Sequence, residues 1–178
     1  PALSPRSDMT GMPSPIAIEL AAALCIAASG APGFLWRRRA GQGMATALNG
    51  IGSAVGLAGL LLHARAPIET RISLTGVLPV GQVAFALDGL SALFLIPILV
   101  VSALGSVYGS GYWREADHRE NGRVLRLWWG IITASMMAVV LAADAILFLI
   151  AWELMAVSAF FLICTEQELN QIMGSLYG

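Results

Sequence analysis

Hydrophobic residues fall in five long, nearly unbroken stretches, separated by shorter segments that are polar or rich in glycine and proline. The stretches cover residues 16–35, 44–64, 90–108, 127–143 and 145–164. A helix that crosses about 30 Å of hydrocarbon needs about 20 mostly apolar residues, so each stretch is long enough to span a membrane. The pattern predicts an all-α integral membrane protein with five transmembrane helices.

The segment between the second and third stretches has a different pattern. From residue 70 to residue 88 apolar and polar positions alternate, and the middle of the segment holds Gly76, Pro79 and Gly81. Alternation on both sides of glycine and proline is typical of a β-hairpin. We therefore expect a small hairpin at 70–88, in the outer loop between the second and third helices.

Short-range signals also predict where two helices begin and how one of them bends. Asp88 precedes the third stretch and Asp144 precedes the fifth, and aspartate is a favoured N-cap residue. Asp144 also forms part of the tight turn required between the fourth and fifth helices. Pro97 lies within the third stretch, where we expect it to kink the helix.

Glycines in the second stretch indicate close packing between helices. Gly52, Gly56 and Gly59 recur at helical spacing, and a similar group of small residues ends the third stretch. Lipid provides no hydrophobic drive for helix association, so close backbone approach over small residues holds such bundles together. We expect the second and third helices to pack tightly against protein.

Composition excludes several classes of protein. The chain is 57% hydrophobic and 12% charged, whereas soluble domains carry about 25% charged residues. This excludes a soluble enzyme, a nucleic-acid binder and a disordered tail. Cys25 and Cys164 lie in apolar stretches and match neither a disulfide framework nor a metal-binding spacing, so we expect no iron–sulfur, haem or nickel cofactor in this chain.

The arginines predict the orientation in the membrane, because cytoplasmic loops carry the excess of positive charge. With the N-terminus outside, seven arginines would lie in the inner loops and three in the outer ones. The inner group is Arg37, Arg38, Arg39, Arg114, Arg119, Arg123 and Arg126, and the outer group is Arg6, Arg65 and Arg71. We expect the N-terminus outside and the C-terminus in the cytoplasm.

These signals divide the chain into consecutive regions. Residues 1–15 form an N-terminal tail, and residues 16–111 hold the first three helices with the hairpin. An inner loop is expected at 112–126, two further helices at 127–164 and a polar tail at 165–178.

Glu153 is the candidate functional residue. It is the ninth residue after Asp144, which places it roughly 13 Å along the fifth helix and close to the membrane midplane. A carboxylate there costs on the order of 2.5–3.5 kcal/mol, so such a group normally faces a bundle interior, finds a partner or takes up a proton. Glu153 is therefore a candidate proton relay. The alternative is a neutral glutamate that only hydrogen-bonds to an adjacent helix.

Other polar and aromatic residues have simpler structural explanations. Glu19 is expected in the first turn of the first helix, where a carboxylate complements the helix dipole. His63 is expected to be an interfacial histidine rather than a point of proton uptake, and His118 belongs to the solvated inner loop. Trp128 and Trp129 are typical of an interfacial anchor.

Two segments resemble a known family. Residues 85–111 (FALDGLSALFLIPILVVSALGSVYGSG) resemble the third span of the antiporter-like proton-pumping subunits, and residues 134–163 (ASMMAVVLAADAILFLIAWELMAVSAFFLI) resemble their fourth and fifth spans. These subunits occur in NADH–quinone oxidoreductase (complex I), membrane-bound hydrogenases and multisubunit Na⁺/H⁺ antiporters. LDGLSALF and FLIAWELMAVSAFFLI are most similar to component B of hydrogenase-4 or its formate hydrogenlyase counterpart.

The resemblance implies a larger fold than this chain contains. Family members have about fourteen helices, built from two inverted five-helix repeats with flanking helices. The fifth-span glutamate, here Glu153, is their essential acid and pairs with a lysine two spans later. This chain has no lysine and matches only the first five spans, so we expect an N-terminal fragment in which a proton path cannot close.

The resemblance also implies a function. We expect the N-terminal part of a proton-translocating subunit of a membrane-bound hydrogenase or complex-I-like oxidoreductase, in the bacterial inner (plasma) membrane. Its partners would be the lipid bilayer and other membrane and peripheral subunits, which would perform the redox catalysis. Two alternatives stay open: a Na⁺/H⁺ antiporter subunit without a redox partner, and a membrane scaffold that does not transport.

Overall fold

The computed structural model describes residues 13–35, 38–65, 69–78, 81–112 and 122–177. Its elements, in chain order, are α1 (Pro15–Ala28), α2 (Pro32–Leu35), α3 (Arg38–Arg65), β1 (Thr70–Leu78), β2 (Gly81–Leu87), α4 (Gly89–Tyr112), α5 (Gly122–Leu141) and α6 (Ala145–Tyr177).

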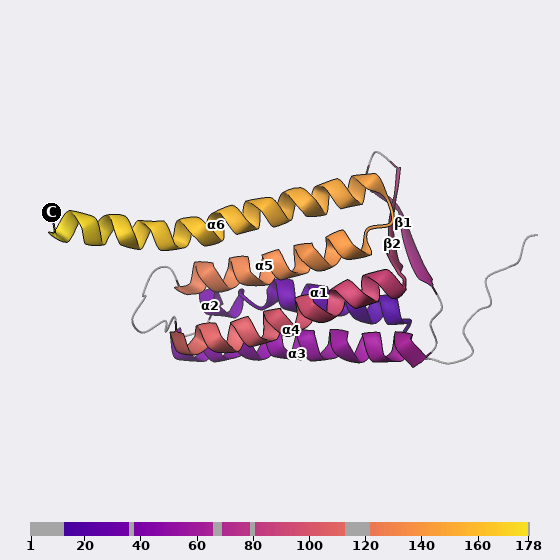
Figure 1. Cartoon of the computed structure of the whole chain (residues 1–178), viewed down its shortest axis with the longest axis horizontal. Coiled ribbons are helices and arrows are strands. Elements are labelled where there is room, and N and C mark those ends of the chain that lie inside the picture. Colours follow the sequence, from indigo (N-terminus) through magenta and orange to yellow (C-terminus); the bar gives the residue numbers. More distant parts are fainter. Residues whose placement is uncertain (1–12, 36–37, 66–68, 79–80, 113–121, 178) are drawn as a thin grey trace, which may run out of the picture.

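The long helices lie side by side and the hairpin crosses one end of them (Figure 1). Helix α1 packs against α3 and α5, α4 packs against the same two helices, and α6 packs against α5. We call the end that carries β1 and β2 the hairpin end. Five helical segments of the described chain are long and apolar enough to cross a membrane, which confirms the five spans predicted from sequence.

The first predicted span is interrupted. Helix α1 ends at Ala28, and after a turn the short α2 begins at Pro32. Within the turn the amide of Ser29 donates to the carbonyl of Ile26 at 3.1 Å. Gly30 allows α5 to approach this turn closely, because a Cβ at this position would overlap the backbone of Leu127 on α5. Pro32 cannot continue the α-helical hydrogen-bond pattern, since it has no amide hydrogen.

Three other boundaries differ from the predictions. Helix α3 begins at Arg38, before the predicted 44–64 span. Helix α5 begins at Gly122, inside the predicted loop at 112–126, while His118 lies outside the described residues. Helix α6 continues to Tyr177, through most of the predicted polar tail at 165–178. Polar residues end an apolar span but do not by themselves end a helix.

The hairpin prediction is confirmed. Strands β1 and β2 are antiparallel, with Thr70 opposite Leu87 and Thr75 opposite Gln82. Leu87 is fully buried and joins the core of the helix bundle. The hairpin is therefore anchored by its inward-facing side chains and closes one end of the bundle.

Backbone hydrogen bonds tie β2 to the turn between α5 and α6. The amide of Ala143 donates to the carbonyl of Ala84 at 2.9 Å. The Asp144 carboxylate accepts hydrogen bonds from the amides of Ala84 and Leu147, each at 2.8 Å. The bond from Leu147 confirms Asp144 as the N-cap of α6. The Asp88 carboxylate accepts from the amide of Ser91 at 2.7 Å, which confirms it as the N-cap of α4.

We expect Asp144→Ala to loosen both β2 and the first turn of α6, because it removes the one carboxylate that accepts hydrogen bonds from amides in both. Amide hydrogen exchange should speed up at Ala84 and at Leu147 together. Asp88→Ala is the matched control, since it removes a cap that binds only its own helix, and exchange should then rise at Ser91 alone. Unchanged exchange at Ala84 in Asp144→Ala would contradict a link between hairpin and turn.

The same bonds predict a pH dependence. The Leu147 amide first, and then the Ala84 amide, hold the pKa of Asp144 below its usual range. A carboxyl group whose pKa is lowered by folding stabilises the folded state at neutral pH, and this contribution disappears as the pH falls through the lowered value. The protection factor at Ala84, which compares its exchange with the intrinsic rate at the same pH, should therefore fall under acidic conditions in the native protein and change less with pH in Asp144→Ala.

The predicted close packing over glycine is confirmed in α3. A Cβ at Gly52 would lie 2.7 Å from Cγ1 of Ile26, and one at Gly56 would lie 2.8 Å from Cδ1 of Leu99. These positions bring α1 and α4 against the same helix. Small residues allow that approach where lipid supplies no other drive for association.

Candidate functional site

Glu153 lies on the side of α6 that faces away from α5. Helix α6 contacts α5 through a face that includes the buried Ala151 and Ser158. Farther along, the ring of Phe161 stacks on that of Trp128 with centroids 4.5 Å apart. Glu153 itself is exposed. The expectation that its side chain faces a bundle interior is therefore not met by the described residues.

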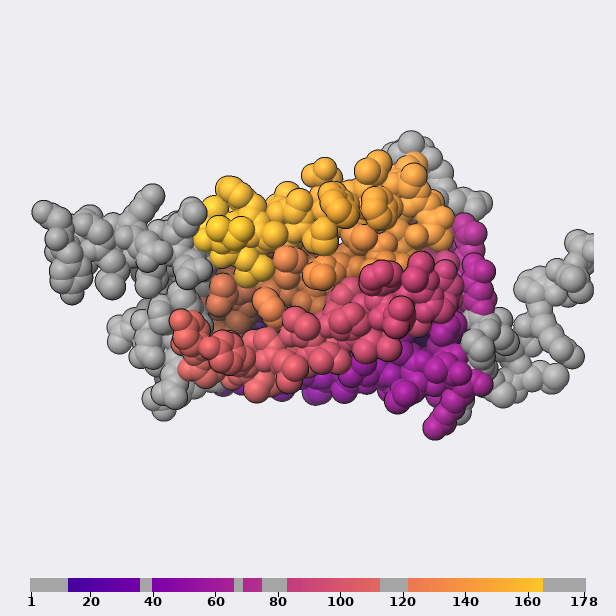
Figure 2. Space-filling model, in the orientation of Figure 1, coloured from indigo at the N-terminus to yellow at the C-terminus, as the bar shows by residue number. Residues whose placement is uncertain are grey.

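The surface around Glu153 is apolar. Leu149, Ile150, Val157 and Phe160 all lie on this side of α6 and are exposed. Figure 2 shows α6 along one edge of the molecule, with its outer side uncovered. A charged carboxylate on such a face would meet lipid in a membrane, at a cost of about 2.5–3.5 kcal/mol. The location of Glu153 thus requires either a proton on the carboxyl group or a covering protein surface.

Glu19 is buried rather than placed at the helix N-terminus, so the sequence interpretation of this residue is wrong. Helix α1 begins at Pro15, and no acidic residue lies in its first turn. The side chain of Glu19 has 0% exposure and points at α3. A Cβ at Gly59 would lie 2.7 Å from its Oε1, and one at Gly56 would lie 3.3 Å from its Oε2. The two glycines leave the space that the carboxyl group occupies.

Neither oxygen of Glu19 has a hydrogen-bond partner among the described residues. Native proteins pair the large majority of their buried polar atoms, so such a group requires an explanation. A charge buried without a partner is far more costly than a neutral acid, and ionisable groups in that position usually give up the charge. Sequence reasoning missed this residue because its burial depends on glycines more than 35 positions away.

Further polar residues are buried on the same face of α3. Asn49, Ser53, Gly56, Gly59 and His63 recur at spacings of three or four residues and therefore lie on one side of the helix. Asn49 Nδ2, Ser53 Oγ and His63 Nδ1 are buried without a hydrogen-bond partner among the described residues. His63 is 4% exposed, so the expectation of an interfacial histidine is wrong.

A hydrogen-bonded group continues from Asn49 into α4 and α5. The hydroxyl of Ser102 lies 3.1 Å from Oδ1 of Asn49 and 3.2 Å from Oγ1 of Thr133. Thr133 Oγ1 also donates to the carbonyl of Trp129 at 2.9 Å, and the indole of Trp129 donates to the carbonyl of Ser102 at 3.3 Å. Trp129 is thus held inside the helix packing rather than serving only as an interfacial anchor.

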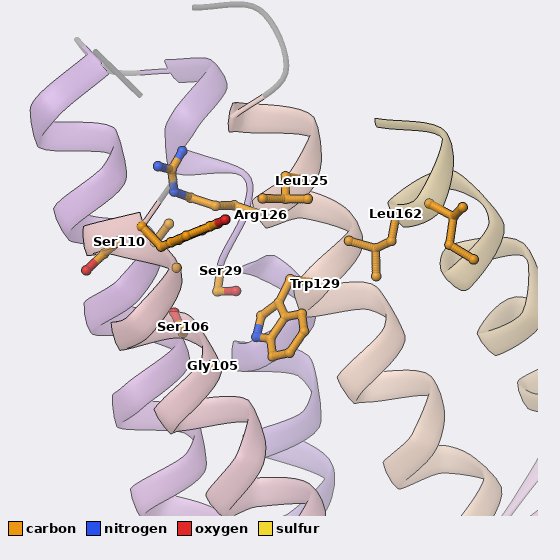
Figure 3. A pocket seen from close by; sticks show the side chains of 12 residues that line it. Ser29, Gly105, Ser106, Ser110, Leu125, Arg126, Trp129 and Leu162 are labelled. Carbon is orange, nitrogen blue, oxygen red and sulfur yellow. The ribbon is translucent and has the colours of Figure 1, made fainter. Parts of the chain in front are cut away.

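Two cavities adjoin this group. One, of about 350 Å³, is lined by Trp129, Gly105, Ser110, Arg126 and Leu162, among others. Figure 3 shows Arg126 and Ser110 toward the helix ends and Trp129 deeper along α5. The other cavity, of about 500 Å³, lies between α4, α5 and α6. Ser102, Thr133 and Trp152 line it, and most of its lining is apolar.

The described residues suggest no metal centre, since no three His, Cys, Asp or Glu side chains among them come together as a metal site would require. Cys25 and Cys164 are half-buried free thiols. Cys25 Sγ donates to the carbonyl of Leu48 at 3.5 Å.

Comparison with known proteins gives weak but consistent similarity. No family model matches the chain. It is 33% identical over 126 residues to an uncharacterized protein of Mycobacterium tuberculosis, covering 69% of this chain and 19% of that protein. It is 28% identical over 141 residues to hydrogenase-4 component B of Escherichia coli, covering 75% of this chain and 20% of that protein. The chain thus spans about a fifth of the length of these curated relatives.

Proposed function

We propose that the chain forms the N-terminal part of a proton-translocating membrane subunit of a hydrogenase or complex-I-like oxidoreductase, with Glu153 as a proton relay. Two findings support the proposal. The chain has five helices able to cross a membrane, and it is similar to hydrogenase-4 component B over most of its length. In this proposal the partner subunits perform the redox chemistry, and this chain takes part in the proton movement that the chemistry drives.

The observation that carries the proposal is the position of Glu153 on α6. An acidic side chain within an apolar membrane helix is by default a functional group, because its insertion is costly and it must be paired or protonated. The uncovered face of α6 is where further helices of the same protein would pack, since the relatives are more than three times as long as this chain. Those helices would supply a polar partner for Glu153.

We further propose that the hairpin end lies outside the cytoplasm and that the N-terminus lies on the same side. The arginines support this orientation, since seven of the ten would then lie in inner loops. Within the described residues, Arg123 and Arg126 lie at the start of α5, the end away from the hairpin. The protein would reside in the bacterial plasma membrane.

The test is proton movement by the full-length protein in inverted membrane vesicles. We expect turnover of the redox reaction to acidify the vesicle interior, and we expect hydrogenase-type subunits to co-purify with the tagged protein. Proton movement that requires a Na⁺ gradient and no redox substrate would instead support the antiporter alternative. Stable insertion with neither partners nor proton movement would support the scaffold.

A further inference from the structure

We infer that Glu19 is a second proton-binding site, separate from Glu153, at the centre of a buried polar path through α1, α3, α4 and α5. The carboxyl group is fully buried, it faces two glycines, and both its oxygens lack a hydrogen-bond partner among the described residues. A proton is the ligand that such a group takes most readily. Binding converts the carboxylate into a neutral acid that needs no counter-charge.

The path runs from Glu19 toward the hairpin end through His63. Gly59 contacts the Glu19 carboxyl group, and His63 follows it by four residues, about 6 Å along α3 and on the same face. His63 is buried and its Nδ1 lacks a partner among the described residues. A neutral imidazole can accept a proton on one nitrogen and release one from the other, so His63 suits proton exchange with Glu19.

In the other direction the path runs through Ser53 and Asn49. Ser53 precedes Gly56 by three residues, about 4.5 Å along the helix, and its hydroxyl is buried and unpartnered among the described residues. Asn49 is one turn farther and accepts from Ser102, which also lies 3.2 Å from Thr133 Oγ1. From Asn49 to His63 the path covers about 21 Å of helix, most of the hydrocarbon thickness.

The inner end of the path opens to the cavity between α4, α5 and α6. Ser102 and Thr133 both line this cavity, and so do Trp152 and Met155 on α6. These two residues lie on either side of Glu153 in the sequence. The rest of the cavity lining is apolar, so the polar path ends at Ser102 and Thr133, and α6 borders the cavity through Trp152 and Met155.

His63 is the buried ionisable group nearest to Glu19 along the path. The other described titratable residues on α1 and on the elements packed around it, including the hairpin, are exposed or only half-buried, and several lie at the opposite end of the bundle. They are Cys25 on α1, Arg65 on α3, Glu69, Arg71 and Asp88 at the hairpin, Tyr108 and Tyr112 on α4, and Arg123 and Arg126 on α5. Protonation of Glu19 should therefore respond chiefly to His63.

Infrared spectroscopy of the full-length protein in membranes tests the inference, because a protonated carboxyl group has a carbonyl band that shifts in D₂O. We expect Glu19→Gln to lose one such band. Glu69→Gln is the matched control, since Glu69 is exposed next to the hairpin, and it should keep the band. A full set of bands in a folded Glu19→Gln protein would overturn the inference.

A second measurement applies even if Glu19→Gln does not fold. Glutamate labelled with ¹³C, in a Glu153→Gln background, should still show a protonated carboxyl band at neutral pH, and absence of that band would overturn the inference. Ser53→Ala and Asn49→Leu should slow the deuterium exchange of the band, whereas unchanged exchange would refute the path. None of these readouts requires proton pumping, so the inference and the proposed function can fail independently.

Discussion

Replacing Glu153 with glutamine in the full-length protein should abolish redox-coupled proton movement while the helices still assemble. Glutamine has nearly the same size and hydrogen-bonding groups but cannot take up and release a proton at neutral pH. Positioned acid–base groups contribute about 10²- to 10⁴-fold to proton-transfer rates, so the expected loss is of that order. Vesicle acidification during redox turnover measures the effect, and the amount of assembled complex shows whether the fold survives.

The same substitution separates a relay from a structural role. If Glu153 only hydrogen-bonds to a neighbouring helix, glutamine should serve nearly as well and pumping should persist. Glu153→Asp keeps a carboxyl group and should retain part of the activity, while Glu69→Gln makes the same chemical change at an exposed position outside the spans and should leave pumping unchanged. Normal pumping by Glu153→Gln would remove this residue from the mechanism.

The features that sequence predicted correctly are set by neighbouring residues. The hairpin at 70–88 follows from alternation around glycine and proline, and its pairing runs from Thr70–Leu87 inward. The caps formed by Asp88 and Asp144 bind amides three residues ahead. These interactions are complete within a few residues, so the local pattern is sufficient to predict them.

Neighbouring residues also determine the break in the first span, but the high mean hydropathy of the stretch masked it. Gly30 and Pro32 are typical signals for the end of a helix. Their neighbours are apolar enough that an average over the span stays high. At the end of α6 the opposite holds: the sequence turns polar after Cys164, but Gly174 is the first residue there that disfavours a helix. Hydropathy measures solvent preference, whereas backbone chemistry decides where a helix ends.

The burial of Glu19 and His63 could not be predicted from local pattern. Each residue lies near a helix end, where an ionisable side chain ordinarily reaches water or the membrane interface. Their burial depends on how α1, α3 and the hairpin pack together. One sequence signal was available, since Gly56 and Gly59 leave space on α3 for a larger group on the facing helix. The two glycines indicate that another helix packs closely against α3, but they do not indicate which residue of that helix fills the space.

The second large prediction concerns the crossing of α1 and α5, where the two helix backbones lie very close together. At Gly130 on α5, a Cβ would overlap the backbone carbonyl of Ile26 and lie 2.9 Å from Oγ of Ser29. The crossing is close from both sides, because Gly30 meets the backbone of Leu127. Backbone atoms cannot rotate away as a flexible side chain can, so Gly130→Ala should force α1 and α5 apart.

We expect Gly130→Ala to lower the free energy of unfolding by about 1–3 kcal/mol, the usual range for overpacking a tight interior. Gly50→Ala is the matched control, because a Cβ at Gly50 in α3 would meet nothing within 4 Å. There the higher helix propensity of alanine should leave stability unchanged or raise it by up to about 1 kcal/mol. Unfolding in detergent with increasing denaturant measures both variants, and equal effects would contradict a backbone-to-backbone contact between α1 and α5. The same change from glycine to alanine is expected to have opposite effects on stability, because a neighbouring helix lies close to Gly130 and none lies close to Gly50. Close packing of helices also encloses the Glu19 carboxyl group beside Gly56 and Gly59.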